Sequence, residues 1–123
     1  MFGFQNENNH KYYLDTVSVV DNSAPTIQLL KNPSFENSTT NATSWVQWCT
    51  STCNGQPGAI ISSANCYLSN GNCFRDTCYA GTGIDFLGQS FPTTNGHNYT
   101  VSFWLISDGG GTTIDNRFYA DII

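Results

Sequence analysis

Short runs of β-forming residues, separated at regular intervals by turn residues, constrain this chain more than any other feature. The clearest run, residues 99–106, follows an Asn95-Gly96 turn and carries apolar residues on both faces, as a central strand does. Thr, Val, Ile and aromatic residues are plentiful, whereas the helix formers Glu, Lys, Ala and Met are scarce. No segment shows a helical period. The sequence therefore predicts an all-β protein folded as a β-sandwich.

The same pattern locates the individual strands. They are predicted at residues 13–19, 27–30, 45–48, 59–62, 84–91, 99–106 and 117–123. In the first of them, alternation places Tyr13, Asp15, Val17 and Val19 on one face. Residues 63–80 are predicted to be a cysteine-rich insertion between two strands.

Charge and hydropathy exclude several classes of partner. The net charge is −5, and Lys and Arg number only 4, so the basic stripe that nucleic-acid binding needs is missing. An acidic membrane surface is disfavoured for the same reason. No apolar run approaches the roughly 20 residues of a membrane-spanning helix, so we expect no membrane insertion. The residues after Met1 lack the apolar stretch of a signal peptide, so a secretion signal is expected upstream of this sequence.

Five cysteines lie within 30 residues of one another: Cys49, Cys53, Cys66, Cys73 and Cys78. Their spacing does not match paired zinc-ligand motifs, and both histidines are remote in sequence. We therefore favour disulfides over zinc or free thiols. Cys49 and Cys53 are predicted to form a local bridge, and two of Cys66, Cys73 and Cys78 a second. The cysteine left over is expected to pair outside this sequence.

Three N-x-S/T sequons, at Asn37, Asn41 and Asn98, accompany the cysteines. Charged residues make up only 11% of the chain, and Asn, Ser, Thr and Gly take their place, as in many extracellular β-proteins. Together these features predict a secreted or cell-surface glycoprotein with disulfide bonds.

Three segments resemble one family. Residues 32–36, Asn-Pro-Ser-Phe-Glu, followed by Trp45, are similar to the opening of galactose-binding-domain-like jelly rolls, which include many carbohydrate-binding modules. Residues 89–105 resemble the middle hairpin of that family. Residues 13–19, Tyr-Leu-Asp-Thr-Val-Ser-Val, resemble its closing strand. The resemblance implies a jelly-roll β-sandwich.

The order of these segments departs from the family, because the closing strand precedes the opening one. Residues 1–21 are then either the closing strand of a preceding module or the permuted last strand of this one. Residues 22–26 would be a linker, and residues 27–123 a jelly-roll module truncated at its C-terminus. On either alternative the jelly roll is incomplete or permuted, and it belongs to a repeat of a multi-module secreted protein.

The resemblance also implies a structural calcium ion where the opening Glu meets the closing-strand Asp. The matching residues are Glu36 and Asp15, and calcium prefers several such oxygen ligands. The alternative is that Glu36 caps a turn and Asp15 is a solvated strand residue.

Sugar binding requires aromatic platforms and polar side chains, which gather on loops. The candidates, all in or near the cysteine-rich segment, are Trp48, Tyr67, Phe74, Arg75, Asp76 and Tyr79. The alternative for the aromatic residues is packing over a disulfide.

No nucleophile elbow, phosphate loop or selected pair of carboxylates is present in the sequence, so we expect no enzymatic activity. The sequence predicts a non-catalytic carbohydrate-binding or adhesion module with a glycan or glycoprotein ligand. The alternative is a structural spacer that contacts only neighbouring modules of its own chain.

Overall fold

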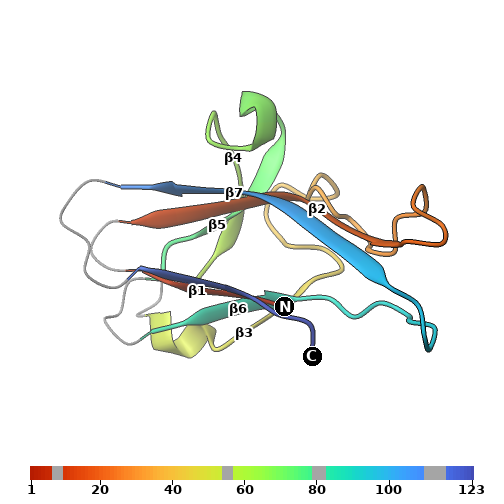
Figure 1. Ribbon diagram of the computed structural model, residues 1–123. Coiled ribbons are helices and arrows are strands. Elements are labelled where there is room, and N and C mark those ends of the chain that lie inside the picture. Colours follow the sequence, from red (N-terminus) through yellow and green to blue (C-terminus); the bar gives the residue numbers. More distant parts are fainter. Residues whose placement is uncertain (7–9, 54–56, 79–82, 110–115) are drawn as a thin grey trace.

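Two antiparallel four-stranded sheets lie face to face in the computed structural model, which describes residues 1–6, 10–53, 57–78, 83–109 and 116–123 (Figure 1). Sheet A contains, in spatial order, β3 (Val46–Trp48), β6 (Asp85–Gly88), β1 (Phe2–Gln5) and β8 (Arg117–Ala120). Sheet B contains β4 (Ala59–Ser62), β5 (Asn72–Asp76), β2 (Lys11–Asp21) and β7 (Tyr99–Asp108). Two short 3₁₀ turns, η1 (Thr50–Cys53) and η2 (Tyr67–Ser69), complete the elements. The predicted all-β sandwich is confirmed, whereas the jelly-roll topology stays a prediction.

Aromatic rings fill the space between the sheets. Phe4 of sheet A is completely buried, and its ring lies 5.5 Å from those of Phe74 and Phe118 and 6.1 Å from that of Tyr12. Burying one such ring removes roughly 150–250 Å² from water, so this cluster contributes a large share of the folding free energy.

Residues 1–21 supply one strand to each sheet. β1 lies between β6 and β8, and β2 lies between β5 and β7. The sequence did not reveal β1, whose Phe2 and Phe4 enter the core. β2 also runs beside the segment after the turn, since Leu29 N donates to Val19 O at 2.9 Å and Val17 N to Pro33 O at 2.9 Å. The two segments whose order is inverted relative to the family are therefore neighbours in space.

A β-bulge interrupts β2. The pairing register shifts between Asp15 and Ser18, and Thr16 takes a positive φ of 50°. Leu14 before the bulge and Val17 after it both point into the core, while Tyr13 points outward. The predicted single face of Tyr13, Asp15, Val17 and Val19 is wrong, because one extra residue reverses the alternation.

The other strand predictions divide into confirmed and corrected ones. β2, β3, β4, β6, β7 and β8 lie where strands were predicted. Residues 27–30 form no strand beyond one bridge between Val20 and Gln28, since the Gln28 side chain accepts hydrogen bonds from Val19 N and Leu30 N in place of a ladder. Residues 72–76, expected in an insertion, form the internal strand β5.

β7 is an edge strand of sheet B rather than the predicted central one. The two apolar faces of β7 are therefore not explained by a central position in the sheet. Phe103 contacts core rings on the inner side, while Trp104 packs on the outer side against a small second cluster with Tyr13 and the Cys66–Cys73 pair. Apolar residues on both faces therefore reflect a covering loop, not flanking strands.

The disulfides are Cys53–Cys78 and Cys66–Cys73, and Cys49 is free and exposed. The predicted Cys49–Cys53 bridge is wrong: Cys53, at 1% exposure, turns inward at the end of η1, while Cys49 precedes that turn and faces solvent. A pair drawn from the last three cysteines is confirmed. Two disulfides indicate a secreted or extracellular protein. In the described ranges, no helix is long and apolar enough to cross a membrane.

Candidate functional site

A loop closed by the Cys66–Cys73 disulfide rises from the outer side of sheet B, where Figure 1 shows η2 above the strands. Two carboxylates hold its base. Asp15 Oδ2 accepts a hydrogen bond from Tyr67 N at 3.0 Å, and Glu36 Oε1 accepts one from Asn72 N at 2.9 Å. Gly71 has a φ of +72°, and a Cβ there would come within 2.2 Å of Glu36 Oε1, so this end of the loop requires glycine.

These are the two carboxylates for which the family resemblance implies calcium. The structure does bring them close together: burial raises the pKa of Asp15, and the negative charge of Glu36 raises it further. Their observed partners are backbone N–H groups of the loop. Calcium at this pair stays a prediction, and the role that the geometry gives them is to anchor the loop.

Beside this loop lies an exposed aromatic surface, which we call the loop face: Asn65, Tyr67, Trp104, Ile106 and Asp108. Tyr67 is 40% exposed, and its ring meets that of Trp104 edge-on, with centroids 6.1 Å apart. Asn65 Nδ2 donates to Asp108 Oδ2 at 3.1 Å. Ile106, which is 37% exposed, lies between Trp104 and Asp108 along β7. The loop face thus combines ring edges and faces with amide and carboxylate groups that water can reach.

The residues predicted to bind sugar are dispersed. Phe74 and Asp76 are 0% exposed and point between the sheets, so neither offers a surface to a glycan. Arg75 lies on the outer side of sheet B in register with Tyr13, and Tyr67 is on the loop face. Trp48 stacks on Phe86 in sheet A, with ring centroids 5.5 Å apart. Tyr79 lies outside the described residues.

The sequence did not identify Trp104, which is half-buried on the outer side of sheet B, as part of a candidate surface. A usable signal was present, because Trp104, Ile106 and Asp108 share the face of β7 opposite to Phe103 and Leu105. What the sequence did not show is that this face points outward, since that depends on which side of β7 the other sheet lies.

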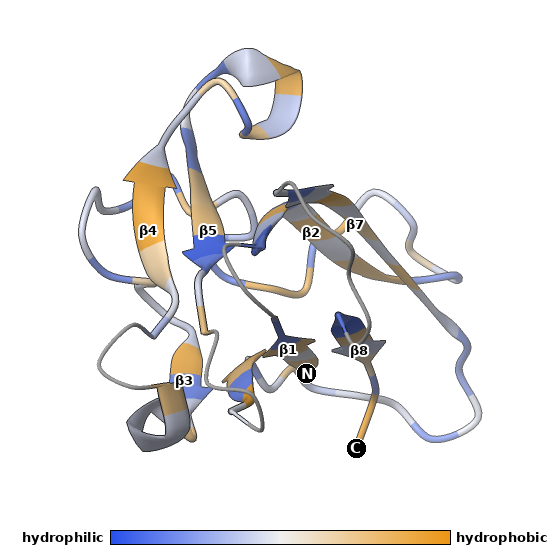
Figure 2. Ribbon diagram, turned by 90° about the vertical axis from the view of Figure 1, so that its left-hand side faces the viewer, coloured by the Kyte–Doolittle hydropathy of each residue, from blue (hydrophilic) through white to orange (hydrophobic). Residues whose placement is uncertain are grey.

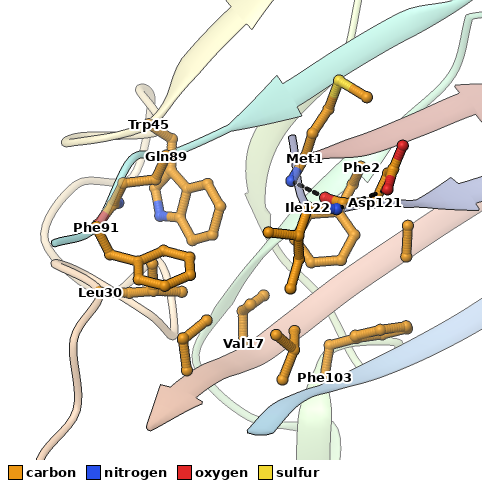
Figure 3. Close-up of a pocket in the computed structure, with 13 residues that line it drawn as sticks. Met1, Phe2, Val17, Leu30, Trp45, Gln89, Phe91, Phe103, Asp121 and Ile122 are labelled. Atoms are coloured by element: carbon orange, nitrogen blue, oxygen red, sulfur yellow. Dashed lines mark hydrogen bonds between the residues drawn. The ribbon is translucent and has the colours of Figure 1, made fainter. Parts of the chain in front are cut away.

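A second candidate site is an apolar cleft of about 400 Å³ between the sheets, near the start of β1 (Figure 3). It opens between the edges formed by β7 and β8. Met1, Phe2, Val17, Val19, Leu30, Trp45, Gln89, Phe91, Val101, Phe103, Ala120, Asp121 and Ile122 line it. Most of these side chains present carbon to the space.

The side-chain polar groups of Gln89 and Trp45, which line this cleft, are already engaged. Gln89 Nε2 donates to Lys31 O and Ser44 O, each at 2.9 Å, and its Oε1 accepts from Lys31 N at 2.6 Å. Trp45 Nε1 donates to Asn32 O at 3.0 Å. The cleft therefore suits an apolar side chain better than a hydroxyl-rich sugar.

Two further features of the surface involve polar residues. The sequon residues Asn37, Asn41 and Asn98 are all exposed, so each is accessible to a glycosylating enzyme.

In the turn before β7, His97 Nδ1 lies 2.5 Å from Asp21 Oδ2, and this hydrogen bond lowers the pKa of Asp21 to about 2.

Among the described residues, no three His, Cys, Asp or Glu side chains converge as metal ligands. Comparison with protein-family models, curated proteins and solved structures found no match to this chain.

Proposed function

We propose that this protein is a non-catalytic carbohydrate-binding or adhesion module that acts outside the cell or at its surface. The observation that carries the proposal is the loop face, where Tyr67 stands exposed against Trp104. Aromatic rings of this kind stack on the C–H faces of sugars, while neighbouring amide and carboxylate groups bind hydroxyls.

The anchored loop supports this assignment. The Cys66–Cys73 disulfide and the hydrogen bonds from Tyr67 N and Asn72 N fix the loop before a ligand arrives. A fixed site loses less conformational entropy on binding, which matters for a small and polar contact.

The test is affinity gel electrophoresis in soluble polysaccharides, guided by a glycan array of neutral and acidic glycans. Tyr67→Ala and Trp104→Ala should abolish the retardation of the wild-type protein. Tyr119→Ala is the matched control, because Tyr119 is also 40% exposed but belongs to sheet A. An array without a single hit, or equal loss with Tyr119→Ala, would contradict the proposal.

The apolar cleft favours a second candidate, a structural spacer that packs against neighbouring modules and binds no glycan. Phe103 is 37% exposed and Ile122 is 62% exposed beside the cleft, where a neighbouring surface would cover them. This candidate predicts no retardation in any polysaccharide. It also predicts that Phe103→Ser weakens self-association in sedimentation velocity, while Tyr67→Ala does not.

A further inference from the structure

Three polar side chains are buried together in the interior. Asn6 follows β1, Asp76 ends β5 and Asp85 begins β6, so both sheets contribute. Their exposed fractions are 1%, 0% and 0%. In Figure 2 the hydrophilic arrowhead of β5, drawn in blue, marks the end of the sandwich where Asp76 lies.

In each carboxylate, only one of the two oxygens accepts hydrogen bonds. Asp76 Oδ2 accepts hydrogen bonds from Asn6 Nδ2 and from Cys78 N, the latter at 3.2 Å. Asp85 Oδ2 accepts from Gly58 N at 2.8 Å and from Gln47 Nε2 at 2.5 Å. The second oxygen of each carboxylate, Oδ1, has no donor, and neither has Asn6 Oδ1.

No Lys, Arg or His of the described ranges forms an ion pair with either carboxylate. Removing two carboxyl groups from water without a positive partner is strongly unfavourable, so the pair must hold either a shared proton or a cation. Burial, and then the charge of Asp85, raise the pKa of Asp76 to about 8, which expresses the same conflict.

The Asn6 oxygen distinguishes these two solutions. One proton can join Asp76 Oδ1 to Asp85 Oδ1, but it leaves Asn6 Oδ1 buried without a partner. A cation bound by the two carboxylates can instead take the Asn6 oxygen as a further ligand. Two carboxylates and an amide oxygen are the hard ligands that Ca²⁺ prefers, and an extracellular module meets calcium at high concentration.

We propose that Asp76, Asp85 and Asn6 form a calcium site inside the sandwich. It differs from the Asp15–Glu36 pair on the loop, because here the three free oxygens are buried and lack donors. Bound calcium would link β5 of sheet B to β6 of sheet A beside the Cys53–Cys78 disulfide, and so hold the sheets together at this end.

The first test compares melting of the full chain in EDTA, in 1 mM CaCl₂ and in 1 mM MgCl₂. We expect calcium to raise the melting temperature by about 5 °C or more over EDTA, and magnesium to raise it less. Asp76→Asn and Asp85→Asn should abolish the response, and Asp15→Asn should retain it. Equal melting of the wild type in EDTA and calcium would overturn the proposal, as would a response lost only in Asp15→Asn.

The second test locates the bound ion by luminescence and uses variants that leave the three proposed ligands intact. Tyr12 lies opposite Asp76 in the pairing of β2 with β5, and burial together with the charge of Asp76 raises the pKa of its phenol. Tyr12 should therefore sensitise the luminescence of Tb³⁺ bound in calcium's place. Tyr12→Phe should reduce that luminescence, while calcium still displaces Tb³⁺ at the same concentration. Tyr13→Phe is the control, since Tyr13 points to the outer side of sheet B. Equal luminescence from Tyr12→Phe and wild type would place the ion elsewhere.

Discussion

The two ends of the sandwich interior differ in chemistry and in closure. At the start of β1 the sheets separate around a largely apolar cleft, where the Gln89 amide is engaged with backbone carbonyls. At the end of β1 they enclose two carboxylates and an amide, and the Cys53–Cys78 disulfide lies next to them. One end is apolar and open, whereas the other is polar, buried and covalently fixed. The difference shows that the two ends of the interior are closed by different means, by side-chain packing around a cleft at one end and by a disulfide beside buried polar groups at the other.

The largest expected effect is a pH dependence of the free energy of unfolding, measured in EDTA, that arises from Asp76 and Asp85 at the polar end of the interior. Because the pKa of Asp76 is raised to about 8 from about 4 in the unfolded chain, the folded state holds the extra proton between these values. The free energy of unfolding should therefore fall by several kcal/mol as the pH rises from about 4 to about 8. Burial also raises the pKa of Asp85, which adds in the same direction. Urea denaturation at a series of pH values measures this slope, and Asp76→Asn should reduce it.

The next largest effect concerns the covalent closure of the same end. Replacing Cys53 and Cys78 by Ala should lower the free energy of unfolding by about 3.5 kcal/mol, because the bridge spans 25 residues. The same change at Cys66 and Cys73, separated by 7 residues, should cost about 2.5 kcal/mol. Chemical denaturation of both double variants tests the order. A greater loss from the shorter bridge would show that the polar end is not the more dependent on its disulfide.

A matched pair of leucines compares the closed core with the cleft. Leu14 is 0% exposed in the core, so Leu14→Ala should cost about 3–4 kcal/mol through lost burial and a residual cavity. Leu30 lines the cleft at 8% exposure, and Leu30→Ala should cost about 2 kcal/mol, since the space it vacates joins an existing opening. Equal losses in urea denaturation would mean that the cleft is as tightly packed as the core.

The smallest effect belongs to the exposed Asp21–His97 pair, outside both ends. Since the folded pKa of Asp21 is lowered to about 2, its contribution is complete above about pH 4 and is lost as the pH falls through 2. Asp21→Asn should slightly reduce the loss of unfolding free energy between about pH 4 and pH 2, and it should leave the pH dependence above pH 4 unchanged. A changed slope between pH 4 and pH 8 would contradict the assignment of that range to the polar end. His97→Ala is the complementary variant.

The fold class, six strands and one pair of cysteines could be predicted from the sequence, because alternation and turn residues act locally. The face of β2 could not, since the bulge at Thr16 is one residue of backbone conformation with no strong sequence signature. The partner of Cys53 likewise depends on η1 bringing it to Cys78 across the fold.

The sites were predictable to a smaller extent. Tyr67 and the proximity of Asp15 to Glu36 followed from loop position and the family resemblance. Asp76 was singled out as a polar surface group, but its place at the end of an internal strand buries it. Its pairing with Asp85 joins two different sheets, which no local pattern in the chain reveals.

The anchored base of the Cys66–Cys73 loop has a consequence for how this surface can vary. The bridge and the two carboxylate contacts close the loop beneath Tyr67, and residues 67–70 take no part in strand pairing. Substitutions, insertions or deletions among residues 68–70, which lie between the two anchoring contacts, would leave the register of both sheets unchanged. The tip of the loop can therefore change in sequence and length without altering the strand pairing below it.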